Sequence, residues 1–398
     1  MNARLLLAPG LACLLAGSLT VPAAAVPAPD VELSAPAGTA AKAETAKTEA
    51  TAATVFARMS EAQRLGQLFM VGTPAALVDP ATRTQIGRYH VGNAMLTGRS
   101  HGGTRPPARV AAALQARATG AATRGVRLLV ATDQEGGDVQ VLHGPGLSEL
   151  PSGLQQGTLR PARLRSDAAT WARELRRAGV NMNLAPVLDT VPSPAAAAAN
   201  PPIGQFDRQY GFDPTVVARH GIAFARGMAD RGVVAVVKHF PGLGRVHANP
   251  DVSSGVVDRV TGPRDPYLRP FQQAIGAGVP SVMISTAYYS RLDARNPAAF
   301  SRSVIHRLLR RQLGFRGVVI SDDLGNAGQV AAWSPGARAV RFLGAGGDLV
   351  LTVNPATLPA MYRAVQTRAA HSPRFRARVH HAVLRVLELK EQRSLLPR

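Results

Sequence analysis

A lysine and a histidine open the segment "KHFPGLGRVHANPD", which spans residues 238–251. The apolar run "GVVAVV" before them predicts a buried strand, and the glycines and prolines after them predict a loop. Lys238 is the only lysine between Lys47 and Lys390, in a chain that otherwise uses arginine. The sequence therefore indicates a specific need for an ammonium group at this corner, beside the imidazole of His239.

Polar residues follow four other apolar runs in the same way. They are Asp133, Asp189, Ser285 with Thr286, and Asp322 with Asp323. An ammonium group beside carboxylates offers paired donors and acceptors, which is what vicinal hydroxyl groups need. For any one of these residues a helix cap or a loop hydrogen bond is the simpler interpretation, but five strands that end in this way favour a shared site. The sequence has no HExxH motif, no close set of His and Asp at strand ends and no phosphate-binding glycine loop, so we expect neither a metal nor a cofactor.

The elements that must position these residues are eight short apolar runs. They occupy residues 67–72, 91–96, 127–133, 180–187, 233–239, 280–285, 317–322 and 348–353. The runs are almost continuously apolar and alternate with amphipathic segments, which is typical of parallel strands covered by helices. This pattern predicts an α/β fold, a (β/α)8 TIM-like barrel at residues 55–398 with a helical C-terminal tail at 356–393. The alternative is a doubly wound open sheet. In a barrel, the residues at the carboxyl ends of the strands meet at one mouth.

The N-terminal residues indicate export. Residues 1–25 have a basic start, an apolar stretch and a small-residue end, which predicts a signal peptide. Residues 26–54, rich in Ala, Pro and Thr, predict a disordered tether. We expect a secreted protein without stable membrane insertion. The lipid-attachment motif around Cys13 is poor, so lipoprotein anchoring is disfavoured. Because Cys13 is the only cysteine, the mature chain would have no thiol for catalysis.

The formal charge of +21 has two interpretations. One is an arginine-rich solvated surface, and the other is attraction to an anionic polymer such as cell-wall material. Nucleic acid is disfavoured as a partner, because aromatic residues make up only 5% of the chain and no binding motif is present.

Five motifs in this order resemble the N-terminal barrel of glycoside hydrolase family 3, and in particular its single-domain β-N-acetylhexosaminidases. They are "DQEGG" (133–137), "NLAPVLDTVP" (183–192), "NPPIGQFDRQYG" (200–211), "KHFPGLG" (238–244) and "VVISDDL" (318–324). The resemblance implies that Asp322 is the nucleophile of a retaining glycosidase. It also implies that Asp133, Arg208, Lys238 and His239 bind the sugar. Asp323 is expected to cap the loop or the next helix.

The opening segment departs from the family pattern. The hexosaminidases have a second histidine where this chain has Leu243, followed by an Asp-Ser-His whose Asp-His pair is the general acid/base. Here those positions read Asn249, Pro250 and Asp251. Three alternatives follow: Asp251 supplies the proton, His247 swings in from the loop, or the acid is lost and the protein binds sugar without cleaving it. A second departure is Asp138, where the family usually has a basic or neutral residue.

The expected function is therefore retaining hydrolysis of terminal β-linked sugars, with an altered acid/base loop. The resemblance points to N-acetylglucosamine from cell-wall or chitin-like oligosaccharides as the substrate. The alternative is a catalytically silent extracellular sugar-binding protein of the same fold.

Overall fold

A computed structural model describes residues 50–397 of the chain. The predicted signal peptide lies outside these residues, as does the predicted tether up to residue 49. The last residues of the predicted tether, from Ala52, form the first turn of helix α1 (Ala52–Arg58). Thr51 caps this helix, since its hydroxyl accepts a hydrogen bond from the Thr54 amide.

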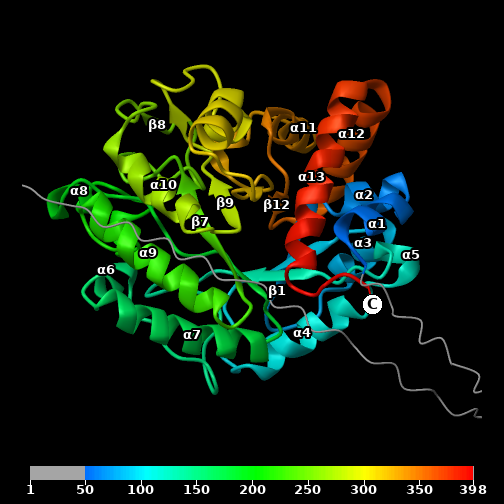
Figure 1. The fold of residues 1–398 in the computed structure, drawn as a ribbon, viewed down its shortest axis with the longest axis horizontal. Helices are drawn as coiled ribbons and strands as arrows, with labels where there is room; N and C mark the ends of the chain where they lie inside the picture. The colour runs from blue at the N-terminus through cyan, green and yellow to red at the C-terminus, as the bar shows by residue number, and fades with distance from the viewer. Residues whose placement is uncertain (1–49, 398) are drawn as a thin grey trace, which may run out of the picture. The chain divides into compact units, whose positions relative to one another are not determined.

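Eight parallel strands form a barrel in chain order. Figure 1 shows strands in the middle of the fold with helices around them. The barrel strands are β1 (Phe69–Pro74), β2 (Asn93–Thr97), β3 (Leu129–Thr132), β6 (Met182–Asn183), β7 (Val234–Phe240), β9 (Ser281–Ile284), β11 (Val318–Ser321) and β12 (Val350–Thr352). Each barrel strand from β1 to β9 pairs with the next along the chain, and β12 pairs with β1. A bridge between Ile320 and Leu349 joins β11 to β12. The predicted barrel is confirmed, because every predicted run overlaps one of these strands, and the open-sheet alternative is wrong.

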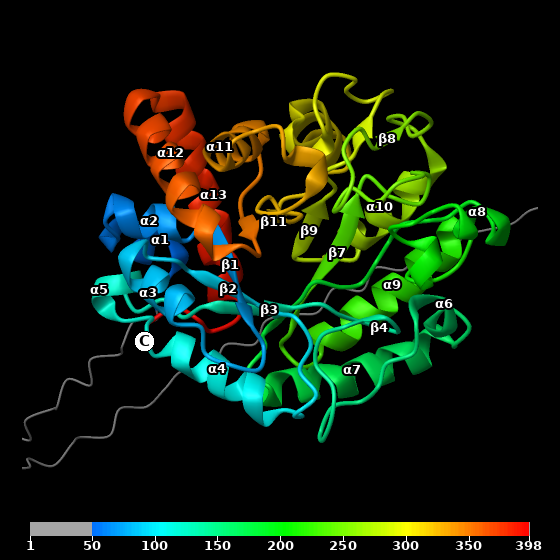
Figure 2. The same cartoon turned by 180° about the vertical axis from the view of Figure 1, so that it is seen from behind.

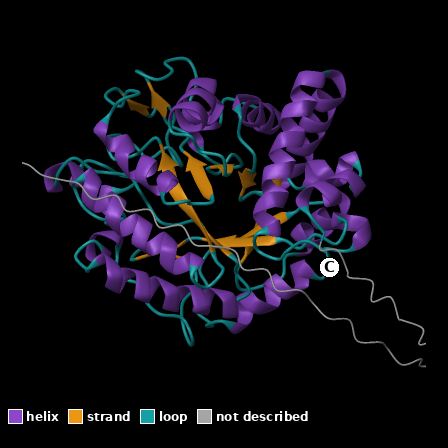
Figure 3. Ribbon diagram, viewed as in Figure 1, coloured by secondary structure: helices purple, strands orange, loops and turns teal. Residues whose placement is uncertain are grey.

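Helices surround the strands, as Figure 3 shows. The longer ones are α3 (Pro80–Arg88), α4 (Arg105–Gln115), α7 (Pro161–Arg177), α9 (Pro214–Ala229), α10 (Arg269–Gly276), a π-helical segment (Ser303–Gln312), α11 (Pro335–Ala345), α12 (Leu358–His371) and α13 (Pro373–Glu391). Shorter ones include α2 (Glu61–Gly66), α5 (Gly120–Thr123), α6 (Gly153–Gln156) and α8 (Pro194–Ala198). Several of these helices begin with a proline in the first turn that follows a capping Asp or Ser. Asp213, for example, caps α9. Figure 2 shows α7 and α9 side by side on the outer face.

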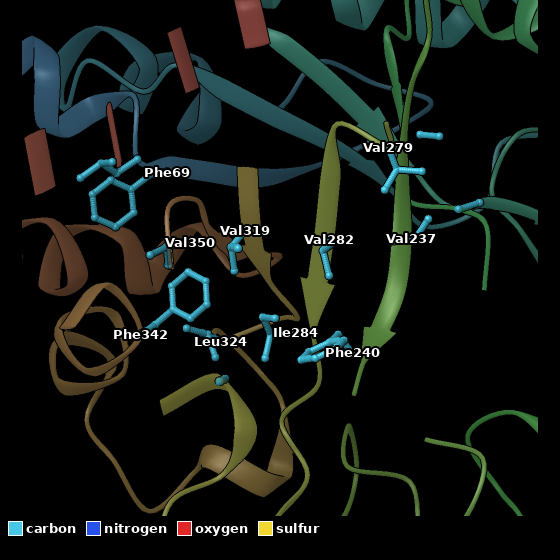
Figure 4. Packing of buried hydrophobic residues seen from close by; sticks show 14 of the residues in the cluster. Phe69, Val237, Phe240, Val279, Val282, Ile284, Val319, Leu324, Phe342 and Val350 are labelled. Carbon is cyan, nitrogen blue, oxygen red and sulfur yellow. The ribbon is translucent and has the colours of Figure 1, made fainter. Parts of the chain in front are cut away.

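The core has two layers. The outer layer lies between the strands and the helices and contains Phe240, Ile284 and Phe342. Figure 4 shows part of this layer, including these three residues. The inner layer fills the barrel with residues such as Met70 and Val234, and it also includes Val386, Leu389 and Leu395 from α13 and the tail after it. The predicted C-terminal helical tail is thus present, and it completes the inner core.

A buried lysine marks the amino ends of the strands. Lys390 on α13 donates to Gln67 Oε1 at 2.7 Å and to the Gly92 carbonyl at 2.8 Å. Gln67 and Gly92 stand just before β1 and β2, so α13 lies against this end of the barrel. Burial lowers the pKa of Lys390 well below its usual value. The opposite end, where the strands finish, is therefore the open one.

Two small sheets build the rim at the open end. The hairpin of β4 (Gln134–Gly136) and β5 (Val139–Gln140) follows β3 directly. The pair of β8 (Val257–Asp258) and β10 (Tyr288–Tyr289) joins the loops after β7 and β9. Within residues 50–397 there is no helix with both the length and the hydropathy needed to cross a bilayer.

Candidate active site

A cavity of about 600 Å³ opens at the carboxyl ends of the barrel strands. Its polar lining comes from β7 and from the loops that follow β2, β3, β6, β7 and β11. Among the polar residues predicted at strand ends, Asp133, Lys238, His239, Asp322 and Asp323 line the cavity, whereas Asp189, Ser285 and Thr286 are completely buried and do not. Six of the seven predicted site residues line it: Asp133, Arg208, Lys238, His239, Asp251 and Asp322. Apolar walls from Met95, Leu184, Met283 and Leu351 form its floor, because these residues belong to the barrel strands or lie next to them. The cavity therefore combines an apolar base with convergent charged groups, as ligand sites commonly do.

Lys238 lies in the middle of a charged cluster. Its Nζ is 2.6 Å from Asp133 Oδ1 and 2.6 Å from Glu135 Oε1, and the side chain is only 3% exposed. Burial alone would lower the pKa of Lys238, but Asp133 and Glu135 outweigh that effect and raise it. The lysine therefore stays charged. With two of its three N–H groups directed at carboxylates, one donor remains for a ligand.

Glu135 is a site residue that the sequence interpretation missed. It receives two hydrogen bonds from Arg208, Nε to Oε2 at 2.8 Å and Nη2 to Oε1 at 2.7 Å. Burial would raise the pKa of Glu135, but Arg208 and Lys238 lower it to about 2. The carboxylate thus holds the two cations in place while remaining ionised. The signal was present in the "DQEGG" motif, whose third residue was quoted but given no role.

His239 is oriented by Asp189, which is completely buried. Asp189 Oδ2 lies 2.7 Å from His239 Nδ1, and Oδ1 accepts the backbone N–H groups of His239 and Leu243. Because the carboxylate only accepts, Nδ1 carries the proton and Nε2 faces Arg208, 3.4 Å away. Asp189 therefore fixes both the imidazole and the start of the loop that contains Leu243.

The two carboxylates after β11 have different surroundings. Asp322 Oδ1 accepts the backbone N–H of Asp323 at 2.9 Å, and among residues 50–397 no hydrogen bond reaches its Oδ2. Asp323 instead accepts the backbone N–H groups of Gly325 (2.8 Å), Asn326 (3.1 Å) and Val353 (3.0 Å). Asp323 therefore holds the loop against the end of β12, which is the capping role expected for it. Asp322 presents a free oxygen to the cavity.

Asp251 faces the cavity from the loop after β7. By its accessible area the residue is exposed, although many protein atoms lie around its carboxyl group. This enclosure raises the pKa of Asp251 to about 6, and the negative charge of Asp322 acts in the same direction. His239, Arg208 and Lys238 oppose the shift. Asp251 is thus close enough to Asp322 for the charge of Asp322 to act on it.

His247 does not reach the cavity. Its side chain is exposed, and its Nδ1 lies 3.3 Å from the Ala199 carbonyl oxygen. It is the one predicted site residue that the structure leaves out of the lining. Asp138, the other departure noted in the sequence, does line the cavity at its mouth, next to Val139.

Comparison with known proteins identifies the family of this chain. The model of the glycosyl hydrolase family 3 N-terminal domain matches residues 61–389. The chain belongs to glycoside hydrolase family 3. A β-hexosaminidase of Xanthomonas oryzae pv. oryzae is 33% identical over 313 residues, which cover 76% of this chain and 88% of that protein. A β-hexosaminidase of Stenotrophomonas maltophilia is 36% identical over 252 residues, covering 61% of this chain and 72% of the relative.

A solved structure is also similar. The β-N-acetylhexosaminidase of Beutenbergia cavernae is 52% identical, with a TM-score of 0.83, and the match covers 84% of this chain and 99% of that one. The predicted family is therefore confirmed, and with it the glycoside hydrolase class. Within residues 50–397 no three His, Cys, Asp or Glu side chains are grouped so as to hold a metal ion.

We expect Lys238→Ala to weaken sugar binding. The lost ammonium removes a charge-assisted hydrogen bond to a sugar hydroxyl, at a cost of roughly 1.5–3 kcal/mol in binding free energy. Titration calorimetry with the monosaccharide product measures the change. Lys390→Ala is the matched control, because it removes the buried lysine at the other end of the barrel and should lower stability without changing affinity. Equal affinity in wild type and Lys238→Ala would remove Lys238 from the binding site.

Proposed function

We propose that this protein is a retaining β-N-acetylhexosaminidase in which Asp322 is the nucleophile and Asp251 is the general acid/base. The observation that carries the proposal is the pair of unlike carboxyl groups in one cavity. Asp322 has a free oxygen and Asp251 has a pKa raised to about 6, so one can attack while the other donates a proton. His247 is not given this role, because it lies outside the cavity.

The proposed reaction has two displacements at the anomeric carbon. In the first, Asp322 Oδ2 forms a bond to that carbon, the glycosidic C–O bond breaks with its electron pair passing to oxygen, and the proton of Asp251 neutralises the departing oxygen. In the second, water attacks the same carbon and releases Asp322, while the Asp251 carboxylate takes a proton from the water. Both groups return to their starting states.

The remaining charged residues fit a role in sugar binding. Three groups face the same cavity: the Asp133 carboxylate, the one remaining N–H donor of Lys238 and the guanidinium of Arg208. They offer hydrogen-bond acceptors and donors to vicinal hydroxyls. Glu135 and Asp189 would hold these groups rigid, since both carboxylates are engaged by the protein itself. Terminal N-acetylglucosamine of cell-wall or chitin-like oligosaccharides is the proposed substrate. The names of the relatives, β-hexosaminidase and β-N-acetylhexosaminidase, support the sugar class in this proposal.

The competing function is sugar binding without cleavage. A panel of aryl β-glycosides with leaving groups of graded acidity separates the two. A hydrolase should turn over the whole panel of aryl N-acetyl-β-glucosaminides, and the most activated substrate should need little help from Asp251. A protein that only binds sugar would release no phenol from any substrate. Absence of turnover on the purified protein would therefore overturn the proposal.

We further propose that the protein acts outside the cell and is attracted to an anionic polymer there. Charge is concentrated in the last part of the chain, where residues 301–397 contain 15 Arg and Lys but only five Asp and Glu. Burial and the neighbouring Arg302, Arg311 and Arg378 lower the pKa of His306, which reflects this excess. Co-sedimentation with cell-wall material should be strong at low salt and lost at high salt. Binding that does not depend on salt would contradict this attraction.

A further inference from the structure

The loop that carries Asp251 is tied to the loop that carries Asp322. The Gly328 N–H donates to the Asp251 carbonyl at 2.8 Å, and the Gln329 N–H donates to the Pro250 carbonyl at 3.0 Å. Gly328 and Gln329 follow Asp322 in the segment after β11. Two segments that are more than 70 residues apart in the sequence are therefore joined through their backbones at the position of Asp251.

The side chain of Gln329 adds a second connection. It is 4% exposed, its Oε1 accepts the Val256 N–H at 2.9 Å, and its Nε2 lies 3.4 Å from the Val256 carbonyl. Val256 stands at the far end of the loop, just before β8. Gln329 thus holds the loop at Val256 through its side chain and at Pro250 through its backbone.

Gly328 allows the close approach of the two backbones. A Cβ atom at this position would lie 3.0 Å from Ser253 N and 3.0 Å from the Val252 carbonyl carbon. Within the loop, Asn249 Oδ1 accepts the Asp251 N–H at 2.9 Å, and the Asn249 carbonyl accepts the N–H of Val252 and of Ser253. The turn around Asp251 is therefore folded tightly and pressed onto the neighbouring loop.

We propose that Gln329 is a positioning residue for the acid/base, fixing Asp251 relative to Asp322 before substrate binds. This inference rests on the proposed function. Proton donation to a leaving oxygen needs the carboxyl group within hydrogen-bond reach of that oxygen, so a loop that is free to move would lose much of the benefit of the acid. Because the two loops are connected, the distance between the carboxyl groups of Asp251 and Asp322 is fixed by the folded protein before substrate binds.

The test compares Gln329→Met with a matched control elsewhere in the barrel. Gln115 makes the same paired contact with Leu128, Oε1 to N at 3.0 Å and Nε2 to O at 3.0 Å, just before β3 at the closed end. Gln115→Met removes an equivalent clamp far from the cavity. For each variant, kcat/KM is measured across the aryl glycoside panel and against pH, and the melting temperature is recorded.

We expect Gln329→Met to lower kcat/KM by roughly 10- to 100-fold on substrates with poor leaving groups and by less than about threefold on the most activated one, because general acid help is worth ~10²–10⁴-fold. Gly328→Ala should give the same pattern, since the added methyl group pushes the Asp251 loop away. If Gln329→Met does not fold, Gly328→Ala carries the test. Gln115→Met should leave the leaving-group dependence unchanged even if it lowers the melting temperature.

Two outcomes overturn the inference, and they differ. If Asp251→Ala shows the loss expected for an acid while Gln329→Met and Gly328→Ala affect all substrates equally or not at all, Gln329 has no positioning role. If Asp251→Ala itself shows no dependence on the leaving group, the proposed function fails and the inference fails with it.

Discussion

Asp322→Asn should lower turnover of an activated aryl N-acetyl-β-glucosaminide by roughly 10⁴-fold or more, the scale observed when hydrolases lose a covalent nucleophile or a triad member. The neutral amide cannot form the glycosyl ester, while its similar shape preserves the contact between its Oδ1 and the Asp323 amide. Stopped assays of phenol release measure the loss. Circular dichroism and the melting temperature should match those of the wild type.

Covalent trapping identifies the attacking residue directly. An activated fluorosugar should accumulate as an adduct on the peptide that contains Asp322, and fragmentation should place the added mass on Asp322 and not on Asp323. Asp323 accepts three backbone N–H groups, so its carboxylate is already committed to holding the loop. An adduct on Asp323, or near-normal turnover by Asp322→Asn, would show the nucleophile assignment to be wrong.

Asp251→Ala should reduce kcat/KM on substrates with poor leaving groups by ~10²–10⁴-fold and leave the most activated substrate nearly unaffected. Added azide should restore the second step, because a strong anionic nucleophile needs no general base. In the wild type, the acid works only while protonated. The rate on poor leaving groups should therefore fall as the pH rises through about 6, the raised pKa of Asp251. This fall should disappear in Asp251→Ala.

His247→Ala serves as the control for this experiment, and its pH profile should remain that of the wild type. A loss in His247→Ala together with normal activity in Asp251→Ala would mean that the loop rearranges and that the imidazole supplies the proton. Normal behaviour of both variants, combined with no cleavage of natural oligosaccharides, would favour the sugar-binding alternative.

The positions of the strands and of most site residues could be predicted because both follow from local pattern. Buried parallel strands require continuous apolar runs, and the first polar residues after such runs must lie at the open end of the barrel. Lys238 and Asp322 were found in this way. The boundary of the N-terminal segment was less predictable, because α1 has only Ala52, Val55 and Met59 nearby to anchor it and its partner α13 is more than 300 residues away.

Features that depend on contacts between distant loops could not be read from the sequence. Glu135 sits inside a short hairpin, beyond the end of β3, and its importance comes from Arg208, 73 residues away. The choice between Asp251 and His247 depends on which way a glycine- and proline-rich loop folds. Gly328 and Gln329, more than 70 residues further along the chain, donate backbone hydrogen bonds to this loop at Asp251 and Pro250, so local propensity alone does not predict its conformation.

The way in which the chain end completes the barrel has a consequence for biosynthesis. The inner core includes Val386, Leu389 and Leu395, and β1 lacks one neighbouring strand until β12 has been made. A chain synthesised from its N-terminus therefore cannot close its barrel until almost all of its residues have emerged from the ribosome. Stable folding is therefore delayed to the end of synthesis. Until then the nascent polypeptide remains incompletely folded and accessible to chaperones and to any export machinery.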